Sequence, residues 1–310
     1  MIVESLEAGK WVWCEKPMCE NLAEQAEIIA VEERAPGKLA IGYNRRFAPA
    51  YQDSRKLLQA QERPWIVNYR LQSCGGYKAH ADQFYHKRAH MLYEGCHILD
   101  LASFFFGTAP ERVFMSGDER ENDSVILEYA DGSRFNFLCT LTVGSSALKK
   151  EYMEIFAYDF AVTVEDFIDM RVRGEEGEFD RIYSPLFGHF AAEVKEYGYD
   201  FWEMLTSQLV QPDRAINKEK GITLEKVVRP QATIPFDVMK HYEEMKHLSW
   251  EKRSFSGDKG WQQAFEHFAH CFLNNQTPQT ADGKAAVLAE KIAFTLLDSK
   301  KEGVPLKFAL

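Results

Sequence analysis

The first 43 residues contain a short strand, a helix and a second strand, and this order restricts the fold more than any other feature of the sequence. Trp11–Glu15 and Lys38–Tyr43 are bulky, apolar runs typical of buried strands. Asn21 can cap a helix that continues to about Glu33 and is stopped by Pro36-Gly37. Two strands joined through one helix are expected to lie parallel in one sheet, with a right-handed crossover.

This sheet is too small to be complete. Two parallel strands with a single crossover helix cannot cover both faces of a sheet. Ile2–Ala8 has the pattern of a helix end closed by Gly9, and no capping Ser, Thr, Asp or Asn precedes it. We therefore expect the chain to begin inside a domain, with residues 1–43 as its remnant.

The pattern changes from residue 44 onward. A helix at Tyr51–Leu58 and another at about Leu92–Phe106 are accompanied by many strand-like runs, and Asp131-Gly132 between two of these runs predicts a hairpin turn. Strands in direct succession favour an antiparallel sheet with helices on one side. We predict strands at Trp65–Gln72, Arg112–Met115, Ser124–Tyr129, Arg134–Leu141, Tyr152–Phe156 and Ala161–Asp166. The fold class is thus α/β followed by α+β.

The rest of residues 44–310 divides into a charged, turn-rich insertion at 172–255 and two helices within 261–300, followed by a short strand at Val304–Phe308. The insertion carries surplus aromatic side chains that could stack on a sugar ring, form a dimer contact or make a satellite core, the last being favoured. These are Tyr183, Phe187, Phe190, Tyr197, Tyr199, Phe201 and Trp202.

Composition excludes several classes of protein. The 310 residues carry 37 Lys plus Arg against 47 Asp plus Glu, a net charge of −10, which is too acidic for a protein whose main function is to bind a nucleic-acid backbone. The sequence has no apolar run of the ~20 residues that a membrane helix needs. The N-terminus has no pattern of a secretory signal, and six scattered cysteines are typical of reduced thiols, so we predict a cytoplasmic protein.

Several motifs, in order along nearly the whole chain except residues 172–255, resemble the Gfo/Idh/MocA oxidoreductases, the family of glucose-fructose oxidoreductase and inositol dehydrogenase. They are Ala8-Gly9-Lys10-Trp11-Val12-Trp13-Cys14-Glu15-Lys16-Pro17, Ile41–Phe47, Gly95–Leu101, Phe105-Phe106-Gly107 with Pro110 and Val113, Tyr129–Ser133, Glu165-Asp166-Phe167 and Gly257-Asp258-Lys259-Gly260. The resemblance implies a Rossmann domain that binds NAD or NADP and a C-terminal domain with an open, largely antiparallel sheet. It also implies hydride transfer at a carbon of a sugar or polyol, and homo-oligomers formed through the sheet.

Two features depart from the family pattern. The glycine-rich loop that would bind the cofactor's pyrophosphate is absent, as is the acidic residue that would bind its ribose. The family frequently has an Asp four residues before the histidine of its G-x-H-x-x-D run, and here that residue is Tyr93, followed by Glu94.

The candidate catalytic residues are Lys16, His97 and Tyr93. Oxidation of a carbinol needs a group that takes the hydroxyl proton. A lysine at the carboxyl end of a strand can stabilise an alkoxide, a histidine titrates near neutrality, and a tyrosine can act as an acid. Each also has a structural interpretation: a surface ion pair for Lys16, a core position for His97 and a packed aromatic for Tyr93. Asp100, three residues after His97, could orient the imidazole or serve only in packing.

Other residues around these motifs are candidates for binding. Candidate cofactor-binding residues are Glu15, Lys16, Pro17, Asn44 and Arg46, and candidate substrate-binding residues are Lys16, Arg45, His90, Glu94 and His97. His80, His86, His90 and His97 are concentrated within 18 residues, and His90, Glu94 and His97 have a spacing that could place three metal ligands on one helix. No further ligand is visible, and we predict no metal.

Three functions fit the sequence. The first is an NAD(P)-dependent oxidoreductase that acts on a hydroxyl of a sugar, polyol or glycoside, with most of its nucleotide-binding half missing. The second is a redox-neutral, NAD-dependent enzyme that cleaves glycosides, and the third is a non-catalytic module for oligomerisation or binding.

Overall fold

The structure, a computed structural model, describes most of the chain. The described residues are 1–35, 38–72, 90–141, 143, 149–175, 177–183, 187–197, 201, 204, 234–244, 257–278 and 281–309. They divide into two units, one of residues Met1–Arg181 with Asp258–Leu310 and one of residues Ile182–Gly257.

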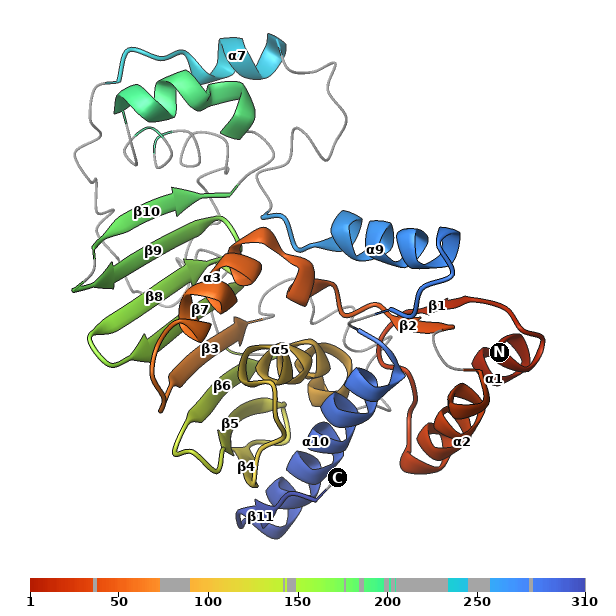
Figure 1. Cartoon of the computed structure of the whole chain (residues 1–310). Coiled ribbons are helices and arrows are strands. Elements are labelled where there is room, and N and C mark those ends of the chain that lie inside the picture. Colours follow the sequence, from red (N-terminus) through yellow and green to blue (C-terminus); the bar gives the residue numbers. More distant parts are fainter. Residues whose placement is uncertain are drawn as a thin grey trace, which may run out of the picture. The chain divides into compact units, whose positions relative to one another are not determined.

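A small parallel sheet forms near the N-terminus, as predicted. β1 (Val12–Cys14) pairs in parallel with β2 (Leu39–Ile41), and α2 (Leu22–Arg34) connects them (Figure 1). The Asn21 side chain caps α2 by accepting a hydrogen bond from the Glu24 amide at 3.0 Å. α1 (Ile2–Glu7) precedes the sheet.

A helix from the far end of the sequence covers this sheet. Aromatic side chains of α9 (Trp261–Leu273) pack edge-on against two tryptophans, Trp11 just before β1 and Trp13 within it. The ring centroids lie 5.6–6.1 Å apart in the pairs Trp11–Phe268, Trp11–Phe272, Trp13–Phe265 and Trp13–Phe268. The sequence predicts this helix, but its periodicity does not indicate which sheet it covers.

The large sheet has nine strands among the described residues, in the order β10-β9-β8-β7-β3-β6-β5-β4-β11. β3 and β6 run parallel, whereas the pairs β3–β7, β7–β8, β8–β9, β6–β5, β5–β4 and β4–β11 are antiparallel. The strands are β3 (Ile66–Gln72), β4 (Arg112–Gly117), β5 (Asn122–Glu128), β6 (Arg134–Thr140), β7 (Glu151–Ala157), β8 (Phe160–Glu165), β9 (Asp169–Gly174), β10 (Phe179–Ile182) and β11 (Leu306–Lys307). This mixed, mostly antiparallel sheet confirms the predicted fold class, and Asp131-Gly132 forms the turn between β5 and β6.

Helices cover one face of the large sheet. α3 (Pro49–Gln59), α5 (Cys96–Phe106) and α10 (Gly283–Glu302) lie on this side (Figure 1). The inward side chains of β3 are buried at alternate positions, Val67, Tyr69 and Leu71, because successive residues of a strand point to opposite faces. The opposite face carries half-buried and exposed side chains, among them Ile126 and Leu138.

The second unit contains an aromatic core. Its described elements are η3 (Phe187–Phe190), helical residues 191–197 and α7 (Val238–Glu244). Phe190 and Phe201 are buried and pack edge-on against each other and against Phe236, with centroids 4.9–5.7 Å apart. These two aromatics therefore belong to a satellite core, whereas Tyr199 and Trp202 lie outside the described residues.

Two further findings concern the described residues taken together. In the part that the structure describes, helices that combine the length and the apolarity for a membrane crossing are absent. Each of the five described cysteines, 14, 19, 96, 139 and 271, is a free thiol.

Candidate active site

Lys16 lies just beyond the carboxyl end of β1, where its side chain extends to the segment before α5. Its ammonium donates a hydrogen bond to the backbone carbonyl of Tyr93 and another to Glu94 Oε1 at 3.4 Å. The side chain is 15% exposed. Lys16 therefore joins the small parallel sheet to the helix that carries His97.

The acceptors of Lys16 belong to a π-helical segment, η2 (Met91–Gly95), that continues directly into α5. Such segments are short and frequently occur at functional sites. Gly95 lies close to the Met91 side chain, since a Cβ at this position would approach the Met91 sulfur to 2.4 Å and the sulfur would have to move.

Glu94 lies among three cations. Its carboxylate is 3.4 Å from Lys16 Nζ, 3.5 Å from Lys150 Nζ and 3.9 Å from Arg45 Nη2. Burial would raise the pKa of the Glu94 carboxyl, but Lys150, Lys16 and Arg45 together hold it below its usual value. Glu94 is therefore ionised at neutral pH.

A second carboxylate, that of Glu151 at the start of β7, is completely buried. Arg45 donates two hydrogen bonds to it, both of 2.8 Å, Lys259 lies 3.0 Å away and the Tyr69 hydroxyl donates at 2.6 Å. Burial opposes ionisation, but Arg45 and Lys259 outweigh it and hold the pKa of Glu151 far below its ordinary value. Arg45 therefore links the two carboxylates, since it contacts Glu94 as well.

Arg46 points to a different partner. It makes two hydrogen bonds with the buried carboxylate of Asp100 and lies over the Phe104 ring at 5.6 Å. Asp100 thus pairs with Arg46 and not with the His97 imidazole. Neither Arg45 nor Arg46 lies on the surface, since their exposures are 4% and 7%.

His97 is buried near the same cations. Its ring packs edge-on against Tyr43 with centroids 6.0 Å apart, and its Nδ1 has no hydrogen-bond partner. Burial, followed by the charges of Arg45, Lys16, Lys150 and Lys259, lowers the pKa of His97 well below its ordinary value. The imidazole is therefore neutral at pH 7, the form that can accept a proton.

His90 has another environment. Its Nδ1 lies 3.2 Å from the Cys139 sulfur, and burial lowers its pKa to about 4. His80 and His86 lie outside the described residues. Among the residues that are described, no group of three or more His, Cys, Asp or Glu side chains could hold a metal ion.

The remaining candidates lie at the carboxyl ends of β1 and β2. Glu15 accepts a hydrogen bond from Trp13 Nε1 at 3.5 Å and lies against Gly42, where a Cβ would come within 3.0 Å of its carboxylate. Pro17 follows Lys16 directly. Asn44 donates to the Lys259 carbonyl at 2.8 Å, while its buried Oδ1 has no hydrogen-bond partner.

The structure thus brings together Lys16, Tyr93, Glu94 and Arg45, with His97 close enough to be affected by the same charges. Arg46 and His90 are bonded to other partners. Sequence reasoning missed Lys150, Glu151 and Lys259 as members of the site. Lys259 stands in a motif already noted, and Glu151 could have been found as a carboxylate at an inward position of a strand.

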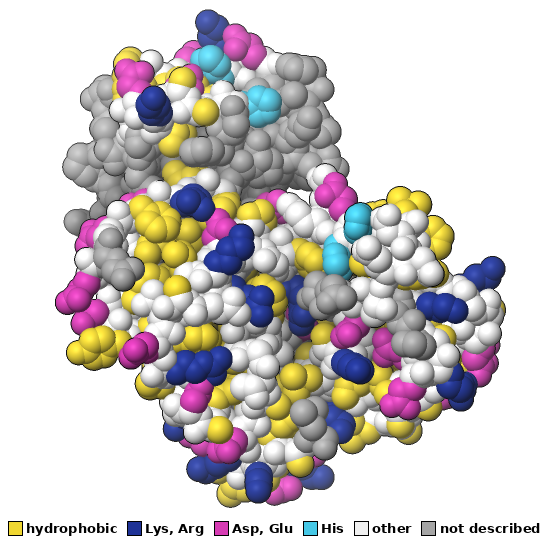
Figure 2. Space-filling model, viewed as in Figure 1, with side chains coloured by type: hydrophobic (Ala, Val, Ile, Leu, Met, Phe, Trp, Pro, Cys, Tyr) yellow, Lys and Arg dark blue, Asp and Glu magenta, His cyan; other side chains and the backbone are white. Residues whose placement is uncertain are grey.

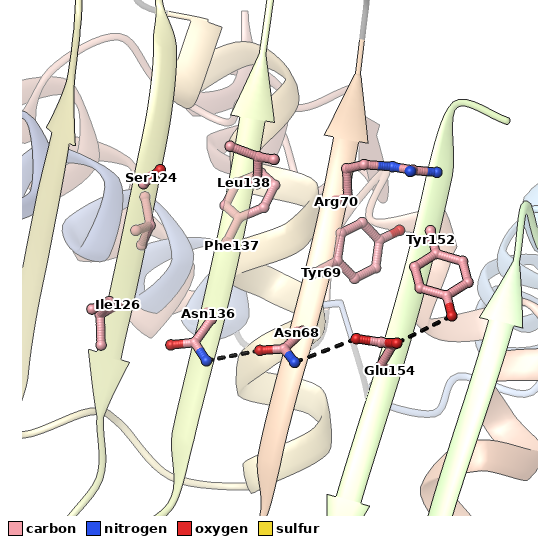
Figure 3. A pocket seen from close by; sticks show the side chains of 11 residues that line it. Asn68, Tyr69, Arg70, Ser124, Ile126, Asn136, Phe137, Leu138, Tyr152 and Glu154 are labelled. Atoms are coloured by element: carbon pink, nitrogen blue, oxygen red, sulfur yellow. Dashed lines mark hydrogen bonds between the residues drawn. The ribbon is translucent and has the colours of Figure 1, made fainter. Parts of the chain in front are cut away.

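A cavity lined by described residues lies elsewhere, on the outer face of the large sheet. It has a volume of about 400 Å³ and is lined by side chains of β3, β5, β6 and β7. Figure 3 shows a row of hydrogen bonds across this face, from Asn136 through Asn68 to Glu154 and Tyr152, at 2.8–3.4 Å. This cavity and the Lys16 site are separate places in the fold.

Comparison with curated proteins shows similarity to oxidoreductases. No family model matches the chain. The uncharacterized oxidoreductase YrbE of Bacillus subtilis is 25% identical over 165 residues, which are 53% of this chain and 48% of YrbE. The chain therefore spans about half the length of this curated relative.

Solved structures agree over a larger part of the chain. An oxidoreductase from Agrobacterium radiobacter in complex with NAD+, L-tartaric acid and magnesium has a TM-score of 0.65 at 12% identity, covering 99% of this chain and 75% of that one. The aldose-aldose oxidoreductase of Caulobacter crescentus has a TM-score of 0.65 at 16% identity, with the same coverage. A myo-inositol dehydrogenase from Corynebacterium glutamicum has a TM-score of 0.61 at 15% identity and covers 100% of this chain and 76% of its own. The resemblance predicted from the sequence motifs is thus confirmed: the chain has the fold of the Gfo/Idh/MocA-type oxidoreductases.

Proposed function

We propose that this protein is a nicotinamide-dependent oxidoreductase that acts on a hydroxyl of a sugar, polyol or glycoside. The observation that carries the proposal is the Lys16 ammonium, held at the carboxyl end of β1 by Tyr93 and Glu94, which lie directly before the helix that carries the buried His97. The carboxyl ends of strands are where open α/β sheets bind ligands. The names of the structural relatives, which include an aldose-aldose oxidoreductase and a myo-inositol dehydrogenase, support this class of substrate.

In this proposal the side chains of the protein stabilise the developing charge and accept the proton. As a carbinol is oxidised, the hydrogen on its carbon leaves as a hydride, with both bonding electrons, and its hydroxyl group loses a proton. Lys16 would stabilise the negative charge that develops on the oxygen, and the neutral His97 would accept the proton. Tyr93, one residue from Glu94, would assist with its phenol. When bound, a nicotinamide cofactor supplies the acceptor for the hydride.

The residues at the strand ends fit the nicotinamide part of such a cofactor. Asn44 has a buried oxygen without a hydrogen-bond partner, and an amide donor would satisfy it. Glu15, Lys16 and Pro17 follow the neighbouring strand, and Arg46 would support this edge through Asp100. The sequence contains no glycine-rich loop for the pyrophosphate, and the choice between NAD and NADP stays open. In this proposal residues 1–43 serve cofactor binding and residues 44–310 serve substrate binding and oligomerisation.

The substrate would meet the side chains around Lys16. Lys16 and Glu94 would contact substrate hydroxyls, since both are partly exposed. Arg45 and His90 are buried and would act through their partners. The cytoplasmic location predicted from the sequence stays a prediction.

Titration of the chain with NADH, followed by nicotinamide fluorescence, tests the cofactor claim. We expect saturable binding, which Lys16→Ala weakens, whereas Lys56→Ala on the exposed side of α3 leaves it unchanged. Absence of binding at millimolar cofactor would contradict the claim for this chain. Product analysis with aryl glycosides tests the substrate claim: free aglycone without net NADH would favour redox-neutral glycoside cleavage, and no turnover would favour a binding module.

The outer face of the large sheet would bind a second copy of the chain. It combines exposed apolar side chains, Ile126, Leu138 and Phe156 at 39–43% exposure, with the polar row from Asn136 to Tyr152. A sheet face of this mixed character suits an interface between identical copies.

A further inference from the structure

The basic side chains around Glu94 and Glu151 form one connected group. We call it the basic cluster, and it consists of Lys16, Arg45, Lys150 and Lys259. Glu94 is shared by three of them, and Glu151 by two. Because Arg45 contacts both carboxylates, all six charges belong to one site.

Positive charge is in excess in this cluster. Four cations face two carboxylates among the described residues that make these contacts. The excess persists when Lys150 is left out, since three cations still face two carboxylates. In Figure 2, Lys and Arg side chains gather near the middle of the visible face. An excess of positive charge in a partly desolvated place attracts anions.

Two of the cations, those of Lys150 and Lys259, are also more accessible than either carboxylate, since the Glu94 side chain is 14% exposed. The side chains of Lys150 and Lys259 are 29% and 26% exposed, whereas Glu151 is 0% exposed. Arg45 is buried, and its guanidinium is used for two hydrogen bonds to Glu151. A ligand would therefore meet lysine ammonium groups, which bind carboxylates and phosphates as point charges.

We propose that the basic cluster is a subsite for an anionic group on the substrate, a carboxylate or a phosphate. The proposal rests on the proposed function in one respect: it assumes that the substrate hydroxyl lies beside Lys16. The anionic group would then lie toward Lys150 and Lys259, so that the substrate is a sugar acid or a sugar phosphate and not a neutral sugar. The low pKa of His97, caused in part by the same four cations, agrees with an excess of positive charge at this place.

Calorimetric titration of the intact chain tests the subsite without any need for turnover. The probes are D-glucuronate and D-galacturonate, the matched neutral sugars D-glucose and D-galactose, and D-glucose 6-phosphate. At least one anionic probe is expected to bind tenfold or more tightly than its neutral partner, the factor that corresponds to about one charge-assisted hydrogen bond. Preferential binding of the uronates would show that the subsite binds a carboxylate, and preferential binding of D-glucose 6-phosphate would show that it binds a phosphate.

Two variants locate the effect. Lys150→Gln is expected to reduce the preference for the anionic probe about tenfold, while Lys56→Gln, which removes the same charge from the exposed pair with Asp53, leaves the preference unchanged. Equal binding of acid and neutral sugar, no binding of any probe, or an equal loss in both variants would overturn the subsite. Failure of all these sugars to reduce NAD would overturn the proposed function, but it would not alter a preference measured by calorimetry.

Discussion

Glu151 is the charged residue on which the site depends most at the scale of single side chains. Moving a carboxylate out of water is costly, and the cost is offset only where charged donors surround it. Here Arg45, Lys259 and Tyr69 all donate to it. This residue connects the start of strand β7 to the segment after β2 and to the loop before α9, and these places carry Lys150, Arg45 and Lys259 of the basic cluster.

Replacement of Glu151 by Gln is expected to lower the free energy of unfolding by about 3 to 5 kcal/mol, because the buried Arg45 and the partly buried Lys259 lose their counter-charge. Glu154→Gln is the matched control, since Glu154 lies on the same strand but at the outer face, with hydrogen bonds to Asn68 and Tyr152. It should change stability by less than about 1 kcal/mol. Urea unfolding measures both, and equal effects would contradict the argument.

The buried histidines make stability depend on pH. Burial, with Lys150 and Lys16 acting against Glu94, lowers the pKa of His90 to about 4 from its ordinary 6.5. A lowered pKa means that the unfolded chain takes up the proton first, so this contribution is complete above pH 6.5 and is lost as pH falls toward 4. The loss is on the order of 3 kcal/mol. His97 contributes in the same direction.

Melting temperatures should therefore change little between pH 7.5 and pH 6.5 and fall from pH 6.5 to pH 4.5, and His90→Gln should flatten the profile in this lower range. His270→Gln, on the exposed side of α9, serves as the control and should leave the slope unchanged. A profile for His90→Gln as steep as that of the unaltered protein would show that His90 does not cause the dependence.

At the scale of elements, the loop before α9 brings Lys259 to Glu151. Gly260 caps α9 with a φ of +79°, and a Cβ there would lie 2.5 Å from backbone atoms of Asn44, Phe47 and Ala48. This loop can approach the 3-10 helix η1 (Asn44–Phe47) so closely only because residue 260 is glycine. The Gly257–Gly260 motif thus has a structural reason.

Gly260→Ala is expected to destabilise the protein by about 2 to 5 kcal/mol, the sum of a left-handed backbone penalty and an overpacking cost. Gly303→Ala provides the comparison, because Gly303 has a φ of +71° but nothing within 4 Å of its would-be Cβ. It should cost only the backbone penalty, about 1 to 2 kcal/mol. Thermal unfolding measures the stability of both variants. Equal losses of stability would show that the close approach of Gly260 to the backbone of η1 does not cause the effect.

Most elements were predictable because their residues follow clear periods or capping rules. Asn21 predicts the start of α2, and the strand-like runs on either side of the Asp131-Gly132 turn predict β5 and β6. β9 and β10 lie beyond the predicted strands. In β9 the exposed Arg171 and Arg173 alternate with the buried Met170 and Val172, and a charged face of this kind resembles a loop in the sequence.

At the scale of the whole molecule, the open face of the large sheet is the surface proposed to bind a second copy. Leu138→Glu would place a carboxylate in the centre of that face, and we expect the dimer dissociation constant to rise at least about a hundredfold, because burial of an unpaired charge costs several kcal/mol. Leu273→Glu on α9, at 79% exposure, is the control. Sedimentation equilibrium measures both, and an unchanged assembly for Leu138→Glu would contradict this interface.

The sequence by itself determined the local features: the parallel pair β1–β2, most of the strand succession of the large sheet, and Lys16 and His97 as candidates. Such features depend on residues near one another in the chain, so periodicity, capping and motifs can reveal them. Only the tertiary structure decided that Arg45 binds Glu151, that Arg46 binds Asp100 and that Lys150 and Lys259 join the site. These pairs are 54 to more than 100 residues apart, and which charge meets which is set by the packing of the sheet, not by any pattern along the chain.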